Sequence, residues 1–211
     1  MPEAGRAGGD VPAVPPAAAE AAPSIATRRG DEGETSLLYG GRIPKDDPHA
    51  EACGSIDEAV SALGVARAQE TDPLRAERLL ALQRELFTVG AELATGRGRH
   101  AQLERHFDTV TGAMVDRVDA QLAGLEERVP LPRGFVVPGG TAVSASVDLA
   151  RTLVRRAERR AVGLRRAGDL ENAEVLRYLN RVSDLLFMIA REAEQGAVTP
   201  LDPGAGAGGP A

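Results

Sequence analysis

The sequence predicts an all-α protein, a bundle of five amphipathic helices. Apolar residues recur three and four positions apart through most of residues 25–195, which is the period of a helix with one buried face. The patterned segments are joined by short connections, which favour antiparallel neighbours. Only 3% of the residues are aromatic, so we expect a core of Leu, Val and Ala between closely packed helices.

The first two predicted helices cover residues 54–69 and the stretch from Asp72 to just before Gly96. In the first helix, Ser55 is the expected N-cap and Glu58 follows three residues later, which is the pattern of a capping box. The second begins with an Asp-Pro pair, a capping residue followed by a proline at the first helical position. The apolar positions are Ile56, Val60 and Leu63 in the first helix, and Leu79, Leu82, Leu86, Val89 and Leu93 in the second.

The third predicted helix is long and ends at the proline-containing segment 129–134. Its apolar face consists of Leu103, Phe107, Val110, Met114, Val118, Leu122 and Leu125. The fourth helix begins at Thr141 and ends at Gly168, and its buried stripe consists of Val147, Ala150, Val154, Ala157, Ala161 and Leu164. The fifth covers residues 170–194, with an apolar face formed by Val175, Leu179, Val182, Leu186 and Ile189.

The two ends of the chain are predicted to be disordered tails around one domain, residues 25–195. Residues 1–24 and 196–211 are rich in Ala, Pro and Gly. The first tail fits neither a secretory signal, which has an apolar core, nor a mitochondrial presequence, which is rich in Arg and poor in acids. No apolar run reaches the roughly 18 residues that a membrane span needs, so we expect a cytoplasmic protein. Short extended pieces are expected only at residues 36–39 and 134–138.

Charge and cysteine content exclude further classes. The net charge is -6 and the isoelectric point is near 5.2, which disfavours an extended nucleic-acid-binding surface. Cys53 is the only cysteine and has no partner for a disulfide or a zinc site, so we expect a small buried helix residue. We find no metal-ligand spacing for His49, His100 and His106, and we assign these histidines no role.

A glycine-rich segment, residues 27–48, interrupts the helical pattern and contains Lys45, the only lysine of the chain. The other 24 basic residues are arginines, from 25 Lys and Arg in total less one lysine. A single lysine in such a background indicates a position where arginine does not substitute, such as a crowded phosphate site. Chance is the alternative explanation. The hydroxyl and glycine residues around it would let backbone N–H groups approach phosphates.

Clustered arginines on the fourth predicted helix point to the same chemistry. Arg151, Arg155 and Arg159 share one face at a spacing of four, and Arg156 and Arg160 lie on an adjacent strip. These charges repel one another unless an anion lies among them, although a solvated face with intrahelical pairs is the alternative. The fifth helix has a polar stripe of Asn180, Ser183, Asp184 and Phe187. The motif GxxxxGK[ST] does not occur. The glycine-rich segment and the clustered arginines alone therefore predict a nucleotide or polyphosphate site on a helical bundle.

Four blocks of the sequence resemble the PduO-type ATP:cob(I)alamin adenosyltransferases. TRRGDEGETSLLYGGRIPKDDP resembles TKTGDxGxTSLxxGxRxxKDD, and EACGSIDEAVSALG resembles EAxGxIDELNSxIG. FVVPGGTAVSASVDLARTLVRRAERR resembles FxLPGG…ALHxARTxxRRAERR, and YLNRVSDLLFMIAR resembles YLNRLSDxLFxLAR. The blocks occur in order between residues 27 and 191, within the predicted domain.

The resemblance implies a five-helix bundle with ferritin-like packing that forms a homotrimer, with ATP and the corrinoid bound between adjacent subunits. The implied reaction transfers the 5′-deoxyadenosyl group of ATP to the cobalt of cob(I)alamin and releases triphosphate. It also implies that Mg²⁺ is held mainly by the triphosphate oxygens and not by a protein metal site. The implied ATP-binding residues are Thr27, Arg28, Arg29, Gly30, Thr35, Ser36, Lys45, Arg155, Arg156, Glu158, Arg159 and Asn180.

Three further residues are implied as catalytic: Phe135, Arg151 and Asp57. The family phenylalanine that matches Phe135 closes the lower corrin face and favours four-coordinate cob(II)alamin, so Phe135 is also the expected cobalamin-binding residue. The residues that match Asp57 and Arg151 form a salt bridge across the subunit interface. The alternatives are a core aromatic for Phe135 and, for Asp57, an acid that the helix dipole favours in the first turn.

The sequence departs from the family pattern at four positions. Arg28 and Arg29 replace Lys and Thr of TKTGD, Val60 replaces the Asn of DELN, and Asp148 replaces the His of ALHxAR. We expect these changes to affect corrinoid binding more than ATP binding. Two alternative functions remain at this stage: a carrier that delivers adenosylcobalamin to a mutase or dehydratase, and a non-catalytic ATP-binding regulatory bundle. A reductase is a further expected partner of the enzyme.

Overall fold

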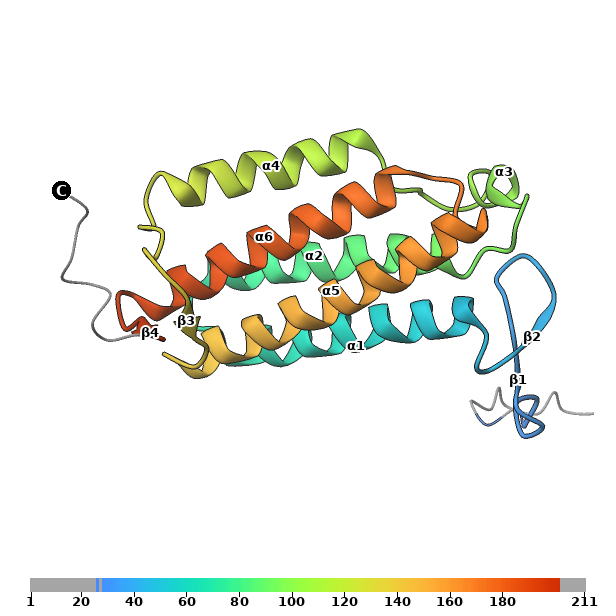
Figure 1. Cartoon of the computed structure of the whole chain (residues 1–211), viewed down its shortest axis with the longest axis horizontal. Coiled ribbons are helices and arrows are strands. Elements are labelled where there is room, and N and C mark those ends of the chain that lie inside the picture. The colour runs from blue at the N-terminus through green and yellow to red at the C-terminus, as the bar shows by residue number, and fades with distance from the viewer. Residues whose placement is uncertain (1–25, 27, 202–211) are drawn as a thin grey trace, which may run out of the picture.

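The computed structural model describes residue 26 and residues 28–201, and these confirm a mostly helical protein (Figure 1). The described residues form six helices: α1 (Pro48–Gln69), α2 (Pro73–Leu93), α3 (His100–Leu103), α4 (Gly112–Glu126), α5 (Ala142–Ala167) and α6 (Glu174–Glu194). They also form four short strands: β1 (Glu34–Ser36), β2 (Arg42–Pro44), β3 (Val136–Val137) and β4 (Thr199–Pro200). None of the described helices is long and apolar enough to cross a membrane.

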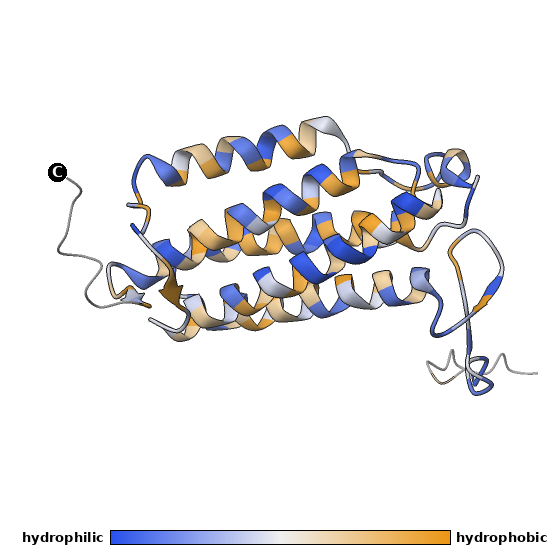
Figure 2. Ribbon diagram, viewed as in Figure 1, coloured by the Kyte–Doolittle hydropathy of each residue, from blue (hydrophilic) through white to orange (hydrophobic). Residues whose placement is uncertain are grey.

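The five long helices pack around one apolar core. Helix α5 packs against both α1 and α6, while α2 packs on α1 and α4 on α6 (Figure 1). All the residues predicted for the apolar stripes of α2, α5 and α6 are buried. The middle of α5, by contrast, presents a hydrophilic surface in Figure 2. This surface carries the clustered arginines.

Local capping signals set three of the helix ends as predicted. The Asp72 side chain accepts a hydrogen bond from the Leu74 N–H at 2.8 Å and caps α2. Thr141 and Ser144 form a reciprocal capping box at the start of α5. Gly168 ends α5 in the left-handed region, with φ of 78°, where glycine carries no steric penalty.

The start predicted for the first helix is wrong. Helix α1 begins at Pro48, where the Asp47 side chain accepts a hydrogen bond from the His49 N–H at 2.8 Å. Ser55 is not a cap. It is fully buried inside the helix, and its hydroxyl donates to the Glu51 carbonyl at 2.8 Å. The additional turns carry Glu51 onto the face that packs against α5.

The third predicted helix is divided into α3 and α4, because tertiary hydrogen bonds replace helical ones between them. Glu92, which is 3% exposed, accepts from the Val110 N–H at 2.6 Å and from Asn172 Nδ2 at 2.8 Å. Asn172 also donates to the Val110 carbonyl at 2.8 Å. Thr111 then caps α4, and Phe107, expected on a buried face, is 47% exposed.

Two short antiparallel strand pairs lie at opposite ends of the helices (Figure 1). Strands β1 and β2 are antiparallel and precede α1, whereas β3 pairs with β4 beyond the end of α6. The first expected extended piece, 36–39, therefore overlaps β1 only at Ser36, while β3 lies inside the second. The tail predicted for residues 1–24 lies outside the described residues, as does most of the tail at 196–211. The described part of the latter contains β4.

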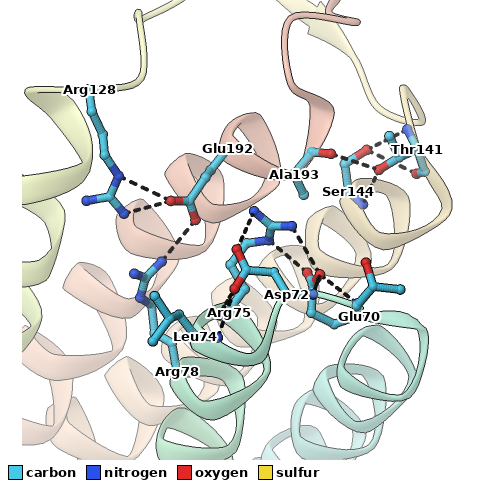
Figure 3. A network of polar contacts seen from close by, with 11 residues as sticks. Glu70, Asp72, Leu74, Arg75, Arg78, Arg128, Thr141, Ser144, Glu192 and Ala193 are labelled. Carbon is cyan, nitrogen blue, oxygen red and sulfur yellow. Dashed lines mark hydrogen bonds and ion pairs between the residues drawn. The ribbon is translucent and has the colours of Figure 1, made fainter.

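A network of ion pairs joins the helices at the β3–β4 end (Figure 3). Arg78 and Arg128, from α2 and from the end of α4, converge on Glu192 of α6, at 3.0 and 2.6 Å. Beside them, Arg75 pairs with Glu70 at 2.9 Å and with Asp72 at 3.1 Å. Burial alone would raise the pKa of Glu70, but hydrogen bonds and charge from Arg75 outweigh burial and lower it. The network ties the α1–α2 turn to the rest of this end.

Candidate functional site

The glycine-rich segment folds into a compact loop around Lys45. The Lys45 N–H donates to the Gly33 carbonyl at 2.8 Å, which brings the end of β2 back to the loop before β1. A Cβ atom on Gly30 would lie 3.0 Å from Lys45 Nζ, so a larger residue there would displace the ammonium by a few tenths of an ångström. Gly33 has a φ of 81°, a left-handed conformation suited to glycine.

The other predicted residues of this segment lie in the same loop and in the hairpin that follows it. Arg28 adopts a positive φ of 59°, and the Arg29 carbonyl accepts from Arg42 Nη2 at 2.8 Å. Thr35 pairs with Ile43 in the hairpin, and Ser36 is exposed next to it. Thr27 lies outside the described residues. Backbone groups, hydroxyls and one cation are therefore gathered on an exposed loop that could contact an anion.

The arginine-rich surface of α5 contains three paired guanidinium groups, of which Arg151 pairs within α5 with Asp148, and two unpaired ones. Arg156 donates to Glu58, and Arg160 lies 2.6 Å from the Glu51 carboxylate and also contacts Ser55. Both acids come from α1, so the pairs join two helices and are not the intrahelical pairs of the alternative interpretation. Arg155 and Arg159 are exposed and make no hydrogen bond or ion pair with any other residue that the structure describes. These two remain available to an external anion.

A cavity of about 300 Å³ lies next to this surface, between α4, α5 and α6. Its lining includes Arg151 and Arg155 from α5 and Ser183, Asp184 and Phe187 from the polar stripe of α6. Leu122, Leu131 and Met188 contribute apolar surface. The cavity thus combines an apolar wall with two arginines and two acids, Glu126 and Asp184. Its arginines could contact the anionic part of a ligand that also has an apolar part.

Asn180 and Glu158 lie close together at the edge of this arginine-rich surface. Asn180 Nδ2 donates to Glu158 Oε1 at 3.4 Å, which links α6 to α5. The same asparagine accepts from Ser183 through its backbone carbonyl at 2.8 Å. The structure therefore brings together Glu158 of α5 and Asn180 of α6, two residues of the predicted ATP-binding set that lie on different helices.

Phe135 is separated from the glycine-rich loop. It lies just before β3, at the end of the molecule opposite β1 and β2 (Figure 1). Its side chain is 84% exposed, which rules out a core aromatic within this chain. The Leu201 N–H donates to the Phe135 carbonyl at 2.9 Å and holds its backbone in place. Within a single chain, Phe135 and Lys45 therefore do not form one site.

Asp57 and Arg151 are not paired within the chain. Asp57 is exposed on α1 and forms no ion pair with any residue in the described part of the chain. Arg151 instead donates to Asp148 at 3.0 Å. Cys53, half-buried one turn before Asp57, has its pKa raised to about 11 by burial and by the Asp57 charge, which makes it a poor nucleophile.

Several residues at the site were not predicted from the sequence. Glu51, Ser55 and Glu58 form a polar stripe at spacings of four and three along α1, and this stripe was the available signal for pairing with arginines. The contact of Asp148 with Arg191, 43 positions away, had no such signal, because nothing in the local pattern specifies it.

Comparisons with known proteins identify the family of this chain. The family model described as cobalamin adenosyltransferase matches residues 25–193. A corrinoid adenosyltransferase of Citrobacter freundii is 40% identical over 81% of this chain and 94% of its own length. The corrinoid adenosyltransferase PduO of the same organism is 34% identical, and this chain spans 51% of it.

A solved structure gives the same result for the fold. It is a variant of the PduO-type ATP:corrinoid adenosyltransferase from Lactobacillus reuteri, complexed with cobalamin and ATP. Its TM-score is 0.73 at 32% sequence identity, and the match covers 82% of this chain and 91% of that one. By sequence and by fold, this chain belongs to the cobalamin adenosyltransferase family.

Proposed function

We propose that this protein transfers the 5′-deoxyadenosyl group of ATP to the cobalt of cob(I)alamin, giving adenosylcobalamin and triphosphate. The observation that carries the proposal is the unpaired Arg155 beside the cavity. It supplies a free guanidinium where an adenosyl donor would place its phosphates. The solved relative, which is complexed with cobalamin and ATP, supports the choice of both substrates.

The proposed reaction does not require the protein to transfer a proton. Reduced cobalt is itself a strong nucleophile, so attack on the ribose C5′ carbon needs no general base. The chain must hold C5′ in line with the cobalt and stabilise the charge that develops on the departing triphosphate. Lys45, Arg155 and Arg159 supply the positive charge. Mg²⁺ bound mainly by the phosphate oxygens completes the neutralisation in this proposal.

The remaining predicted residues have complementary roles. Arg156 is held by Glu58 and contributes a fixed guanidinium to the phosphate region. Glu158 and Asn180 border the same surface and contact each other. The backbone of residues 28–30 and the hydroxyls of Thr35 and Ser36 provide neutral donors. On the corrinoid side, the exposed ring of Phe135 is free to cover the lower face of the macrocycle.

Active sites shared between subunits of a homotrimer are part of the proposal. Lys45 and Phe135 lie at opposite ends of one chain, so a neighbouring copy would be needed to place both beside the same substrates. Asp57 is exposed and without an ion pair among the described residues, which leaves it available to Arg151 of a second copy. Val65 and Leu149 expose apolar surface on α1 and α5. In this view the five long helices form the family bundle, residues 25–195, in a cytoplasmic enzyme.

An anaerobic assay with MgATP and chemically reduced cobalamin tests the proposal. We expect the absorbance change that accompanies formation of the cobalt–carbon bond, together with one triphosphate per adenosylcobalamin. Omission of ATP is the control. ATP binding without any transfer would contradict the enzyme and favour a regulatory bundle, and tight binding of adenosylcobalamin without transfer would favour a carrier.

A further inference from the structure

A buried cluster of charged side chains lies between the start of α5 and the end of α6. Asp148, Arg191 and Glu194 are each 3% exposed or less. Arg191 lies 2.6 Å from Asp148 Oδ2 through Nη2 and 2.8 Å from Glu194 Oε2 through Nε. Two carboxylates and one guanidinium sum to one negative charge. Because an uncompensated charge is costly in a low-dielectric interior, the cluster requires one more cation.

Arg151 supplies that cation. Its Nε donates to Asp148 Oδ1 at 3.0 Å, so the two oxygens of Asp148 are divided between Arg151 and Arg191. With Arg151 included, two positive charges balance two negative ones. The ring of Phe187 also lies against both guanidinium groups, 4.9 Å from Arg191 and 5.9 Å from Arg151. Arg151 is therefore held by a carboxylate and by an aromatic ring.

The same contacts leave the outer donors of Arg151 available. Its side chain is 25% exposed and lies on the wall of the site cavity. Among the described residues, neither of its Nη groups has a hydrogen-bond partner. The Nε bond thus uses the donor nearest the helix, while the two terminal groups remain for an external anion. Phe187, which also lines the cavity, limits the directions that the guanidinium can take.

We propose that Asp148 is a positioning residue for Arg151. Asp148 accepts a hydrogen bond from Arg151 Nε, and its charge makes the buried cluster depend on a second cation. Both effects hold the guanidinium of Arg151 in one orientation, with its Nη donors directed to an external anion at the active site. The inference rests on the proposed function, in which Arg151 pairs with Asp57 of a neighbouring copy beside the shared active site. Asp148 does not line the cavity, so it acts only through Arg151.

Two isosteric substitutions separate positioning from general stabilisation. Asp148→Asn removes the anionic acceptor of Arg151 but leaves Arg191 paired with Glu194, so we expect a folded protein. Glu194→Gln makes the same chemical change within the same cluster, leaves Arg191 paired with Asp148, and does not touch Arg151. Both variants should melt at a lower temperature than the wild type. Only the first should alter catalysis.

Steady-state kinetics test this expectation. In Asp148→Asn, kcat should fall roughly ten- to a hundredfold, the range for a misplaced catalytic group, with KM for ATP changed by no more than about twofold. In Glu194→Gln, kcat should stay within about twofold of the wild type. In an Arg151→Ala background, Asp148→Asn should have no further effect on kcat, since a positioning residue has nothing left to position. Equal losses in the two single variants, or an undiminished loss in that background, would overturn the inference.

A second readout does not depend on activity. In a double-mutant cycle of chemical denaturation, Asp148→Asn and Arg151→Ala should be coupled by about twofold or more in the unfolding equilibrium constant. Glu194→Gln and Arg151→Ala, which share the charge balance of the cluster but no contact, should be coupled more weakly. A wild-type protein without transferase activity would refute the proposed function, and this cycle would then decide the inference by itself. Absence of coupling between positions 148 and 151 would overturn it.

Discussion

Lys45 lies across Gly30, with its Nζ atom 3.0 Å from the point that a Cβ on Gly30 would occupy. The glycine therefore determines where the only lysine of the chain can place its charge. An added methyl group would push the ammonium aside without removing it. The effects of the position and of the charge of the Lys45 ammonium can thus be tested with separate substitutions.

We expect Lys45→Ala to weaken MgATP binding by about ten- to a hundredfold, because one charge-assisted contact of roughly 1.5–3 kcal/mol is lost. Gly30→Ala should weaken binding less, since the charge is displaced and not deleted. Isothermal titration calorimetry measures both. The matched control on α5 is Arg155→Ala against Arg166→Ala. Both arginines are exposed, but only Arg155 lines the site cavity. Unchanged affinity in Lys45→Ala and Arg155→Ala would remove them from the site.

The proposed pairing of Asp57 with Arg151 of a neighbouring copy predicts both assembly and charge complementarity. Sedimentation should give a mass of about three times the 22.0 kDa of one chain. Asp57→Arg and Arg151→Asp should each abolish most of the activity, and the double swap should restore part of it if the two residues pair. A fully active monomer would refute the shared site. Failure of the swap in an intact trimer would refute only the pair.

Phe135→Ala should leave folding and ATP affinity nearly unchanged, because the side chain is 84% exposed. The yield of four-coordinate cob(II)alamin should fall, and with it the rate when a weak reductant must generate cob(I)alamin in the site. With cob(I)alamin that has been reduced beforehand, the loss should be much smaller. The measurement is the relative rate under the two regimes, together with the cob(II)alamin spectrum. Equal losses in both regimes would mean that the ring positions substrate instead.

Stability should decline in acid because of the α1–α2 turn. Arg75 and neighbouring N–H groups outweigh burial and lower the pKa of Glu70 from its ordinary 4.5, while the Leu74 N–H is the largest cause of the lowered pKa of Asp72. A carboxyl group whose pKa is lower in the folded state stabilises the fold above its unfolded pKa. That contribution is lost as pH falls through the folded pKa.

The corresponding variant is Glu70→Gln, which we expect to cost about 1 kcal/mol of unfolding free energy at neutral pH. The difference from the wild type should shrink as the pH falls below 4.5, because protonation then removes the same charge from the wild-type protein. Denaturation at a series of pH values measures it. A difference that stays constant down to pH values well below 4.5 would contradict the assignment.

Local signals were sufficient for much of the helical pattern. Asp72, Thr141 and Gly168 act through neighbours a few residues away, and each helix end that they predict is observed. The Asp47-Pro48 pair carries the same signal as Asp72-Pro73 and was missed because it lies inside the glycine-rich segment. The break between α3 and α4 could not be found in this way. It depends on Glu92 and Asn172, which are distant in sequence.

In the candidate site, too, local sequence signals predicted some features, and contacts between distant residues determined the others. Lys45 and the arginines of α5 could be predicted as candidates from residue type and spacing, and the structure leaves them exposed or partly exposed. The partners of those arginines could not be predicted, because Glu58 with Arg156 and Glu51 with Arg160 are contacts between helices. Patterns along the chain indicate which side chains are chemically suited to a site. Packing determines which of them are free to act.

The pairing of β3 with β4 makes the chain beyond α6 a structural part of the segment that carries Phe135. Val136 and Val137 take their backbone partners from Pro200 and Thr199, and Leu201 bonds to Phe135 itself. A tag or fusion partner placed directly after α6, or a shortened chain ending there, would therefore alter the proposed corrinoid end of the molecule while leaving every helix intact. Protein variants intended for cobalamin studies should keep residues 199–201 in their native sequence.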